Sequence, residues 1–294
     1  MRSGEQAVPG QVLIGVSGYN YLGWRGLYYP PGLPPRRFLE HISRRLPSVE
    51  LNATFYSLQS PACFARWVEQ TPPEYVLAVK GSRFITHNLK LGRPDLALAN
   101  FYASGVLALG RKTGPFLWQL PPLLRFNPER VEAFIDALPR TTAEAERLAA
   151  RHDPSLLKRG ALAEAAGRCR YRHAFEVRHP TWMDPEFFAL LRRRHCGFVI
   201  ADTAGKFPYS EEITADFVYV RLHGSQVLYG SSYTDDELDR WTDRVEGWAR
   251  QGLDVYVYFD NDQHAYAPLD ATRLLARCAS RGLVAPTWAP ARAA

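Results

Sequence analysis

The sequence predicts an α/β fold, a single-domain (β/α)8 barrel of the TIM type, and three observations lead to this prediction. Eight short runs rich in β-branched and aromatic residues recur along the 294 residues, and helical patterns separate most of them. Helix-start signals repeat between the runs, and polar residues gather near the ends of the runs. Strand and helix in alternation form a parallel sheet with right-handed crossovers, and eight such units close a barrel.

The elements follow in order along the chain. Strands are predicted at 12–16, 48–52, 75–80, 116–120, 173–178, 197–201, 217–222 and 254–259. Three helix starts place a capping side chain before a proline suited to the first turn, at Ser60-Pro61, Asn127-Pro128 and Asp184-Pro185. Thr234 with Glu237 indicates a capping box. Further helix starts are predicted near Pro35, Pro94 and Pro268, and helix ends near Gly252 and Gly282.

Two irregularities interrupt the regular alternation. The segment between the sixth and seventh strands is too short for a full helix, so a loop or single turn is predicted there. Residues 141–170, rich in Ala and Arg, predict an extra helical segment before the fifth strand. A doubly wound open sheet is the alternative fold, but Gly15, Gly18 and Gly23 lack the GxGxxG spacing of its phosphate site. We expect one domain over 1–294, with a core of about 11–284 and loose tails, including the last dozen residues.

Composition limits the classes of protein. Hydrophobic residues make up 46% and charged residues 22%, which is typical of a globular chain with a sizeable core. No uninterrupted apolar stretch is long enough for a membrane-spanning helix, and the first residues lack the pattern of a secretory signal, so a cytoplasmic protein is expected. The net charge is +6, from 36 Lys and Arg against 30 Asp and Glu. This surplus permits a nucleic-acid partner without requiring one.

Cysteine and cofactor motifs are sparse. Cys63, Cys169, Cys196 and Cys278 are widely spaced, with no CxxC pair and no Cys/His cluster, so free thiols and no structural zinc site are expected. No cofactor motif is present, and no cofactor is expected.

A polar stripe marks the carboxyl-terminal halves of five predicted strands. Residues two apart share a face of a strand. The residues that share the polar face are Glu50 with Asn52, Lys80 after Ala78, Gln119 after Leu117, Glu176 with Arg178, and Tyr219 with Arg221 and His223. The apolar residues between them should pack under the helices. The sequence therefore predicts a polar pocket at the carboxyl-terminal rim of the barrel, where active sites of this fold lie.

The same segments resemble a known family, the YecE-like proteins of domain of unknown function 72. The matching segments are GVSGYNYLGWRG at 15–26, VELNATFY at 49–56, AVKGSRFITH at 78–87, FLWQLPP at 116–122, FEVRHPTW at 175–182, YVRLHG at 219–224 and YFDND at 258–262. Tyr19 stands where an aromatic residue, often tryptophan, is usual, and Asp260 where asparagine is common. The resemblance implies a TIM-type barrel, likened in architecture to sugar-isomerase and endonuclease IV barrels, but no particular activity.

The residue types favour an enzyme that binds a phosphate- or carboxylate-bearing small molecule. Arginine forks and a lysine point charge suit such anions, and Glu176 or His223 is expected to move a proton, with Lys80 as the third catalytic candidate. The expected binding residues are Glu50, Asn52, Tyr56, Gln119, Arg178, Trp182, Asp202, Arg221 and Asp262. Rim aromatics including Tyr19, Tyr21 and Trp24 suit stacking on a base or sugar.

Other hypotheses stay open at this point. A divalent metal held by Glu50, Glu176, Asp202, His223 and Asp262 is disfavoured, because Lys80, Arg178 and Arg221 would repel it. A hydrolase acting on nucleic-acid phosphodiesters is the alternative enzyme, and a non-catalytic ligand-binding protein is the third class. A Schiff-base role for Lys80 is disfavoured, since nearby carboxylates should raise its pKa. His87 and His179 are expected to be structural residues.

Overall fold

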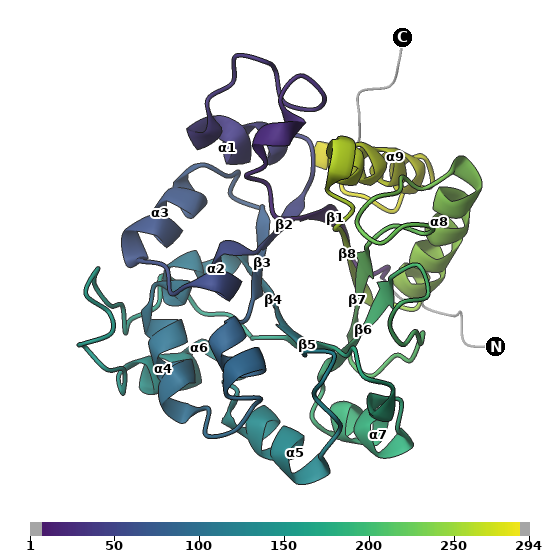
Figure 1. The fold of residues 1–294 in the computed structure, drawn as a ribbon. Helices are drawn as coiled ribbons and strands as arrows, with labels where there is room; N and C mark the ends of the chain where they lie inside the picture. The colour runs from purple at the N-terminus through teal and green to yellow at the C-terminus, as the bar shows by residue number, and fades with distance from the viewer. Residues whose placement is uncertain (1–7, 289–294) are drawn as a thin grey trace, which may run out of the picture.

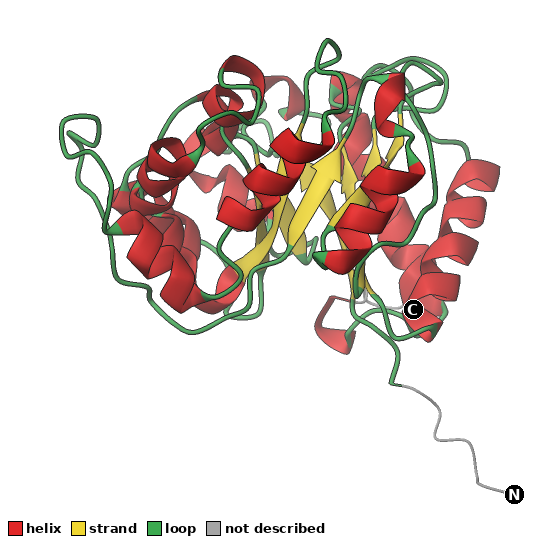
Figure 2. Ribbon diagram, turned by 90° about the horizontal axis from the view of Figure 1, so that it is seen from below, coloured by secondary structure: helices red, strands yellow, loops and turns green. Residues whose placement is uncertain are grey.

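The computed structural model describes residues 8–288, which form a closed barrel of parallel strands in the order β1 to β8. Figure 1 looks into the barrel, with the helices around it, and Figure 2 shows the strands enclosed by helices from the side. The strands are β1 Val12–Ser17, β2 Ser48–Leu51, β3 Val76–Lys80, β4 Thr113–Gln119, β5 His173–Glu176, β6 Gly197–Asp202, β7 Phe217–Leu222 and β8 Asp254–Phe259. The predicted fold class is confirmed.

The helices pack outside the strands. They are α1 Phe38–Ile42, α2 Ala53–Tyr56, α3 Pro61–Glu69, α4 Asp95–Ala103, α5 Pro128–Ala137, α6 Thr142–Ala149, α7 Pro185–Arg193, α8 Asp235–Arg250 and α9 Tyr266–Ser280. Short 3-10 turns lie at Leu22–Trp24, Pro35–Arg37, Val106–Lys112, Pro180–Trp182, Gln263–Ala265 and Pro286–Trp288, and a π-helical turn at Phe84–Asn88. Within the described chain, no helix combines the length and the apolar character needed to cross a bilayer.

The predicted caps form at the helix starts. The side chains of Ser60, Asn127 and Asp184 accept hydrogen bonds from backbone N–H groups in the first turns of α3, α5 and α7. Thr234 and Glu237 form the capping box of α8. These local contacts satisfy N–H groups that a helix start leaves without partners, which is why they could be read from sequence.

The helix ends follow the same logic. Gly252 and Gly282 come two residues after the ends of α8 and α9, with φ of 82° and 72°. Glycine adopts this left-handed conformation without a steric penalty, so the chain can leave the helix and turn into the next segment.

Two layers of side chains divide the core. The outer layer lies between the strands and the helices and holds most of the buried apolar residues. The inner layer fills the barrel itself with Leu13, Ala78, Leu117, Ala174, Val199, Ala201, Phe217, Tyr219, Tyr256 and Tyr258. Its aromatic rings pack on one another, with 5.2 Å between the ring centres of Tyr219 and Tyr258 and 6.0 Å between those of Phe217 and Tyr256.

Both predicted irregularities are present. No helix lies between β6 and β7 in the described chain, so the short crossover is confirmed. The extra helix before β5 is confirmed as α6, although it is shorter than the segment 141–170, and residues 150–172 form no helix. Pro154 lacks a backbone N–H, and Gly160 has a φ of 98°, so the helix does not continue. The rest of the segment hydrogen bonds to the chain near α4 instead, as in Leu162 N–H to the Ala103 carbonyl.

The predicted loose tail is wrong for its first part. Residues 283–288 bury Val284 and end in a 3-10 turn, and the Trp288 ring packs 6.1 Å from that of Tyr75. The apolar surface of Val284 and Trp288 explains why this segment covers the barrel rather than leaving it. Residues 289–294 and 1–7, which belong to the predicted tails, lie outside the described residues.

Candidate functional site

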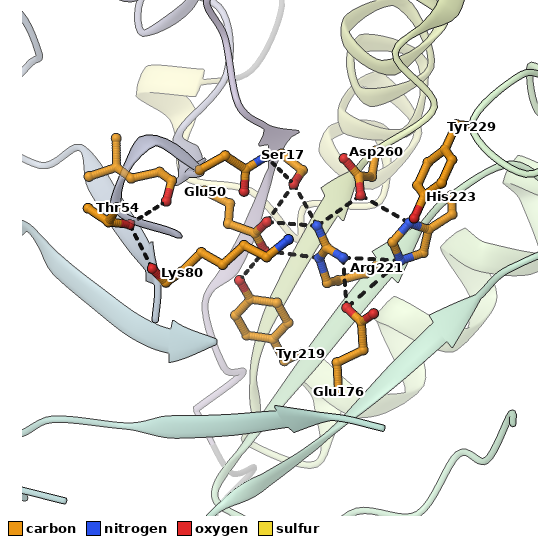
Figure 3. A network of polar contacts seen from close by, with 12 residues as sticks. Ser17, Glu50, Thr54, Lys80, Glu176, Tyr219, Arg221, His223, Tyr229 and Asp260 are labelled. Carbon is orange, nitrogen blue, oxygen red and sulfur yellow. Dashed lines mark hydrogen bonds and ion pairs between the residues drawn. The ribbon is translucent and has the colours of Figure 1, made fainter. Parts of the chain in front are cut away.

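Arg221 lies at the centre of a polar network inside the barrel, above the inner aromatic layer (Figure 3). Its side chain is 0% exposed. The guanidinium donates to both carboxylate oxygens of Glu50, at 3.1 Å from Nε and 2.8 Å from Nη2. It also donates from Nη1 to Glu176 at 2.7 Å and from Nη2 to Asp260 at 2.9 Å. One buried cation thus holds three carboxylates.

Four strands around the barrel bring these groups to one height. Glu50 is on β2, Glu176 ends β5, Arg221 is on β7 and Asp260 follows β8, all at inward positions of the alternation. Two more inward residues complete the bonds of Glu50, because Ser17 on β1 donates its hydroxyl to one oxygen and Tyr219 donates to the other at 2.6 Å. Burying an isolated charge costs free energy, so removing one member of this network would leave the others buried without their partners and destabilise the fold.

Glu176 has both oxygens in ion pairs. Arg178 donates from Nε to its second oxygen at 2.9 Å, while the Arg178 guanidinium stacks on the Phe207 ring at 4.7 Å. Burial by itself raises the pKa of Glu176, but the charges of Arg221 and Arg178 outweigh burial and hold that pKa well below its usual value. Such a carboxylate is a weak proton acceptor, so we do not assign Glu176 the acid–base role expected from sequence.

His223 is completely buried beneath Tyr229. Its Nε2 lies 3.2 Å from Nη1 of Arg221, and its Nδ1 lies 3.0 Å from Asp260 without the alignment of a hydrogen bond. The Tyr229 ring packs edge-on at 5.4 Å between ring centres. Both ring nitrogens therefore face protein groups, and a ligand reaches His223 only if Tyr229 moves.

Lys80 differs from the other charged residues of the network. The residue is 8% exposed, and its Nζ lies 4.6 Å from the centre of the Phe55 ring. Its side chain extends toward Glu50 and Arg221 (Figure 3), but Nζ makes no hydrogen bond or ion pair with any described residue. Thr54 fixes its backbone by donating to the Lys80 carbonyl at 2.7 Å.

The environment of Lys80 shifts its pKa in the direction opposite to the one expected from sequence. Burial and the neighbouring charge of Arg221 lower the pKa of Lys80 from 10.5 to about 8. The carboxylates expected to raise this pKa are present, but Glu50, Glu176 and Asp260 point their oxygens at Arg221. Their attraction for the ammonium is therefore smaller than the cost of its desolvation.

The β3 and β5 side of the barrel mouth carries a positive surplus. His87 lies in the π-helical turn after β3. Burial and the positive charges of Lys80, Arg178 and Arg83 lower the pKa of His87 to about 4, which agrees with this surplus. Its Nδ1 lies 2.8 Å from the Thr86 hydroxyl. This position of His87 at the barrel mouth was not predicted, since a π-helical turn has no simple sequence pattern.

Other predicted binding residues lie around this mouth. Gln119 ends β4 between Lys80 and Glu176, and its buried side chain makes no hydrogen bond with the described residues. Asn52 donates to Ser17 at 3.0 Å, while its buried Oδ1 has no partner in the described chain. Tyr56 is 69% exposed on α2 at the rim.

Asp262 lies beside the network and has an unusual carboxyl group. Its Oδ1 is buried without a hydrogen-bond partner among the described residues. Burial and the nearby charge of Asp260 raise the pKa of Asp262 to about 8, so this carboxyl carries a proton at neutral pH.

Two predicted site residues are elsewhere. Asp202 accepts a hydrogen bond from the Tyr233 hydroxyl at 3.0 Å, outside the barrel, because Ala201 takes the inward position on β6. Trp182 is 1% exposed, donates to the Leu124 carbonyl at 2.7 Å and packs against Phe187 in the outer layer. His179, predicted to be structural, caps the turn before Trp182.

Sequence reasoning did not count four network residues as site residues. Ser17 and Asp260 occupy inward positions on β1 and after β8, so applying the alternation to every strand would have found them, whereas Tyr219 was placed on the polar face with Arg221 but was not counted as a binding residue. Tyr229 lies in the loop after β7 with a φ of 63°, and no local pattern indicates that it covers His223.

A cavity of about 760 Å³ lies next to the network rather than in it, on the β1–β2 side. Its lining includes Gly18, Tyr19, Tyr21, Asn52, Tyr56, Arg66 and Trp67. Asn52 belongs to both, since it also bonds Ser17 of the network. Because the cavity does not reach Arg221 or Lys80, we locate the candidate site from unpaired charges rather than from volume.

The carboxylates do not fit a metal site. In the described part of the chain, no group of three or more His, Cys, Asp and Glu side chains is arranged to hold a metal ion. Glu50, Glu176 and Asp260 direct their oxygens to Arg221, whose charge would oppose a cation at the same place. We therefore derive no chemistry through a metal.

Comparisons with known proteins agree with the fold. The UPF0759 protein YunF of Bacillus subtilis (strain 168) is 22% identical over 293 residues, which cover 90% of this chain and 93% of that protein. The UPF0759 protein YecE of Escherichia coli (strain K12) is 32% identical over 104 residues, 34% of this chain and 37% of that protein.

Two solved structures are also similar. A DUF72 family protein of Thermotoga maritima MSB8, TM1631, has a TM-score of 0.71 and 26% identity, covering 90% of this chain and 97% of that one. A DUF72 family protein of Enterococcus faecalis V583, EF0366, has a TM-score of 0.69 and 16% identity, covering 91% and 95%, which shows a shared fold. Residues 13–293 match the family described as protein of unknown function DUF72, and the chain therefore belongs to that family.

Proposed function

We propose that the protein is an enzyme that binds a small anionic molecule at the carboxyl-terminal mouth of the barrel. The observation that carries this proposal is the unpaired ammonium of Lys80, which is buried at the mouth without a carboxylate partner among the described residues. A buried cation without a partner is costly, and an anionic ligand would supply the missing charge.

The neighbours of Lys80 support an anion. Arg178 uses Nε and Nη2 on Glu176 and Tyr229, so its Nη1 is left without a partner in the described chain. Gln119 lies between them on β4 with its side-chain amide unbonded. A point charge, one edge of a guanidinium and an amide donor suit a carboxylate or phosphate group.

Arg221 has a different role from the one expected from sequence. Its Nε, Nη1 and Nη2 already donate to protein acceptors, so no donor remains for a ligand. We infer that Arg221 organises the barrel interior, and that Lys80 and Arg178 meet the ligand.

Features of the surface weigh against the nucleic-acid alternative. Three arginines form ion pairs with acidic residues, mainly of α8: Arg273 and Arg277 of α9, and Arg281 directly after it. These arginines are therefore not a free basic surface. Trp24 and Trp182 are buried, which leaves neither indole ring open for stacking on bases.

Titration calorimetry with inorganic phosphate, oxalate and pyruvate tests the proposal. We expect at least one of these anions to bind the wild type and Lys80→Met to weaken its binding by about 10-fold or more, as loss of a charged hydrogen bond does. Lys158→Met, which removes the same charge from an exposed lysine, should leave the affinity unchanged. Equal affinity in wild type and Lys80→Met, or no binding of any of the three anions, would contradict the proposal. Salt-sensitive binding of an oligonucleotide in place of these anions would favour the alternative.

A further inference from the structure

We propose that Lys80 forms a covalent imine with its ligand, so that the ligand is an anionic aldehyde or ketone such as a 2-oxo acid. This inference rests on the proposed function and adds the chemical class of the substrate. It assigns to Lys80 the role of a nucleophile, in addition to its charge.

The first argument is the contrast between two buried lysines of this chain. Lys112 is 9% exposed, and its Nζ donates to the carbonyls of Val68 and Thr71, both at 2.7 Å, and to the Thr71 hydroxyl at 3.0 Å. Lys80 is equally buried, yet its Nζ has no such acceptor in the described chain. Lys112 is therefore held as a structural ammonium, whereas the nitrogen of Lys80 is left free to react.

The second argument is the place of the Lys80 nitrogen. It lies over the face of the Phe55 ring at the barrel mouth, next to Arg221. Burial and the adjacent guanidinium of Arg221 disfavour the protonated amine more than the face of the Phe55 ring favours it, and they lower the pKa of Lys80 to about 8. With such a pKa, roughly a tenth of the side chain is neutral amine at pH 7, against roughly 0.04% for an ordinary lysine.

The third argument is a neutral imidazole beside the same ring. His87 packs edge-on against Phe55, at 5.2 Å between ring centres, so Lys80 and His87 share Phe55 as a neighbour. With a pKa lowered to about 4, His87 is uncharged at neutral pH, so it adds no positive charge beside Lys80 and can hydrogen bond a ligand. Its Nε2 makes no hydrogen bond with the described residues, since only Nδ1 is engaged, by Thr86.

The chemical step balances without any further reactant. The lone pair of the neutral Lys80 amine attacks the carbonyl carbon, a C–N bond forms, and the electron pair of the C=O π bond moves to oxygen. The oxygen takes up the two amine hydrogens as protons, the C–O bond breaks and water leaves, so that a C=N bond remains. Arg178 and its free Nη1 would hold the acid group of the ligand while this occurs.

Reductive trapping tests the inference directly. The folded wild-type protein is treated with glyoxylate, pyruvate or the uncharged propanal in the presence of sodium cyanoborohydride, and the modified lysine is mapped by peptide mass spectrometry. We expect a reduced adduct on Lys80 from a 2-oxo acid, formed about tenfold or more faster than the propanal adduct and than any adduct on Lys112 or Lys158.

Two variants make the outcome specific. Lys80→Arg keeps a positive charge but has no nucleophilic amine, so it should form no adduct at this position. Lys158→Arg should be trapped at Lys80 as the wild type is. If Lys80→Arg does not fold, the wild-type pH profile decides, because trapping at Lys80 should reach half its maximum rate near pH 8.

Different results would contradict anion binding and imine formation. If an anion binds in a Lys80-dependent manner but no adduct forms on Lys80, or if the adduct forms no faster than on Lys158, the imine is wrong and the binding function stands. If 2-oxo acids and propanal label Lys80 equally fast and no anion binds, anion recognition is wrong and the reactive amine stands.

Discussion

At the scale of single residues, Lys80 carries a cost that the fold does not offset. Its ammonium is desolvated and has no partner in the described chain, and the lowering of its pKa from 10.5 to about 8 measures this cost. A side chain that destabilises its own fold while lining the mouth of a barrel is typical of functional sites rather than of structural ones.

Replacing Lys80 by methionine should stabilise the protein. Because the folded state disfavours the charged amine, Lys80→Met should raise the free energy of unfolding by about 1–3 kcal/mol at pH 7. The gain should shrink as the pH rises from about 8 to 10.5, where the wild-type folded and unfolded chains both come to hold the neutral amine. Urea unfolding monitored by tryptophan fluorescence measures it.

Lys112 provides the matched control. It is equally buried, but its ammonium satisfies the carbonyls of Val68 and Thr71. Lys112→Met leaves those acceptors unpaired and should lower the free energy of unfolding by about 1–3 kcal/mol. Equal destabilisation by Lys80→Met and Lys112→Met would contradict the claim that Lys80 destabilises the folded protein.

At the scale of the elements, one guanidinium connects strands that are far apart in sequence. Arg221 of β7 reaches Glu50 of β2, Glu176 of β5 and Asp260 after β8, so it spans the barrel rather than one pair of neighbours. The helices depend on local caps, whereas this end of the barrel depends on a non-local charge network.

Removing that guanidinium should therefore destabilise the barrel strongly. Arg221→Met leaves Glu50, Glu176 and Asp260 buried without their shared counter-charge, and we expect a loss of about 3–5 kcal/mol in the free energy of unfolding. Arg277→Met removes the same charge from a more exposed pair with Asp235 and should cost at most about 1 kcal/mol. Thermal and urea unfolding of both variants measure these changes. Equal losses in the free energy of unfolding would contradict a special role for Arg221.

At the scale of the whole molecule, acid acts on several buried groups at once. Glu176 and Asp260 keep pKa values below their usual range because the charge of Arg221 outweighs the effect of burial, so their stabilisation is present above about pH 4.5 and is lost at lower pH. Burial lowers the pKa of His173 to about 3 and that of His87 to about 4, so the unfolded chain takes up these protons first as the pH falls below about 6.5. Asp262, with a pKa raised to about 8 by burial, acts in the opposite direction, since its stabilisation is complete below about pH 3.8 and is lost as the pH rises through 8.

His173→Gln isolates one of these contributions. The Gln amide can still accept from Trp118 Nε1 and donate to the Pro139 carbonyl, the two partners of His173, but it cannot take up a proton. Between about pH 6.5 and 4, the free energy of unfolding of this variant should fall less steeply than that of wild type, by up to about 1.4 kcal/mol per pH unit. Urea unfolding at a series of pH values measures both slopes. Identical slopes would show that His173 titrates normally in the folded protein.

The sequence predicted most of the fold because its signals are local. Caps such as Ser60 before Pro61 and the alternation of Glu50 with Leu51 depend on neighbours along the chain, and so did the eight strands. The extra helix after Thr141 was predicted as well, but its end at Ala149 was not, because the Ala- and Arg-rich composition beyond it hid the effect of Pro154.

The site was less predictable, for two physical reasons. Whether a strand residue points into or out of the barrel depends on its position in the alternation and not on its polarity. Asp202 is polar, yet it ends its strand on the outer face. Partner choice is also non-local: the carboxylates near Lys80 could have paired with it or with Arg221, and only the folded barrel decides that Arg221 takes them. The direction of the Lys80 pKa shift followed from that choice.

The aromatic layer formed by Phe217, Tyr219, Tyr256 and Tyr258 fills the barrel interior below the polar network, so the interior is open only at the carboxyl-terminal mouth. Whatever reaches Lys80 comes and goes by the same route, since these rings block passage from the other end.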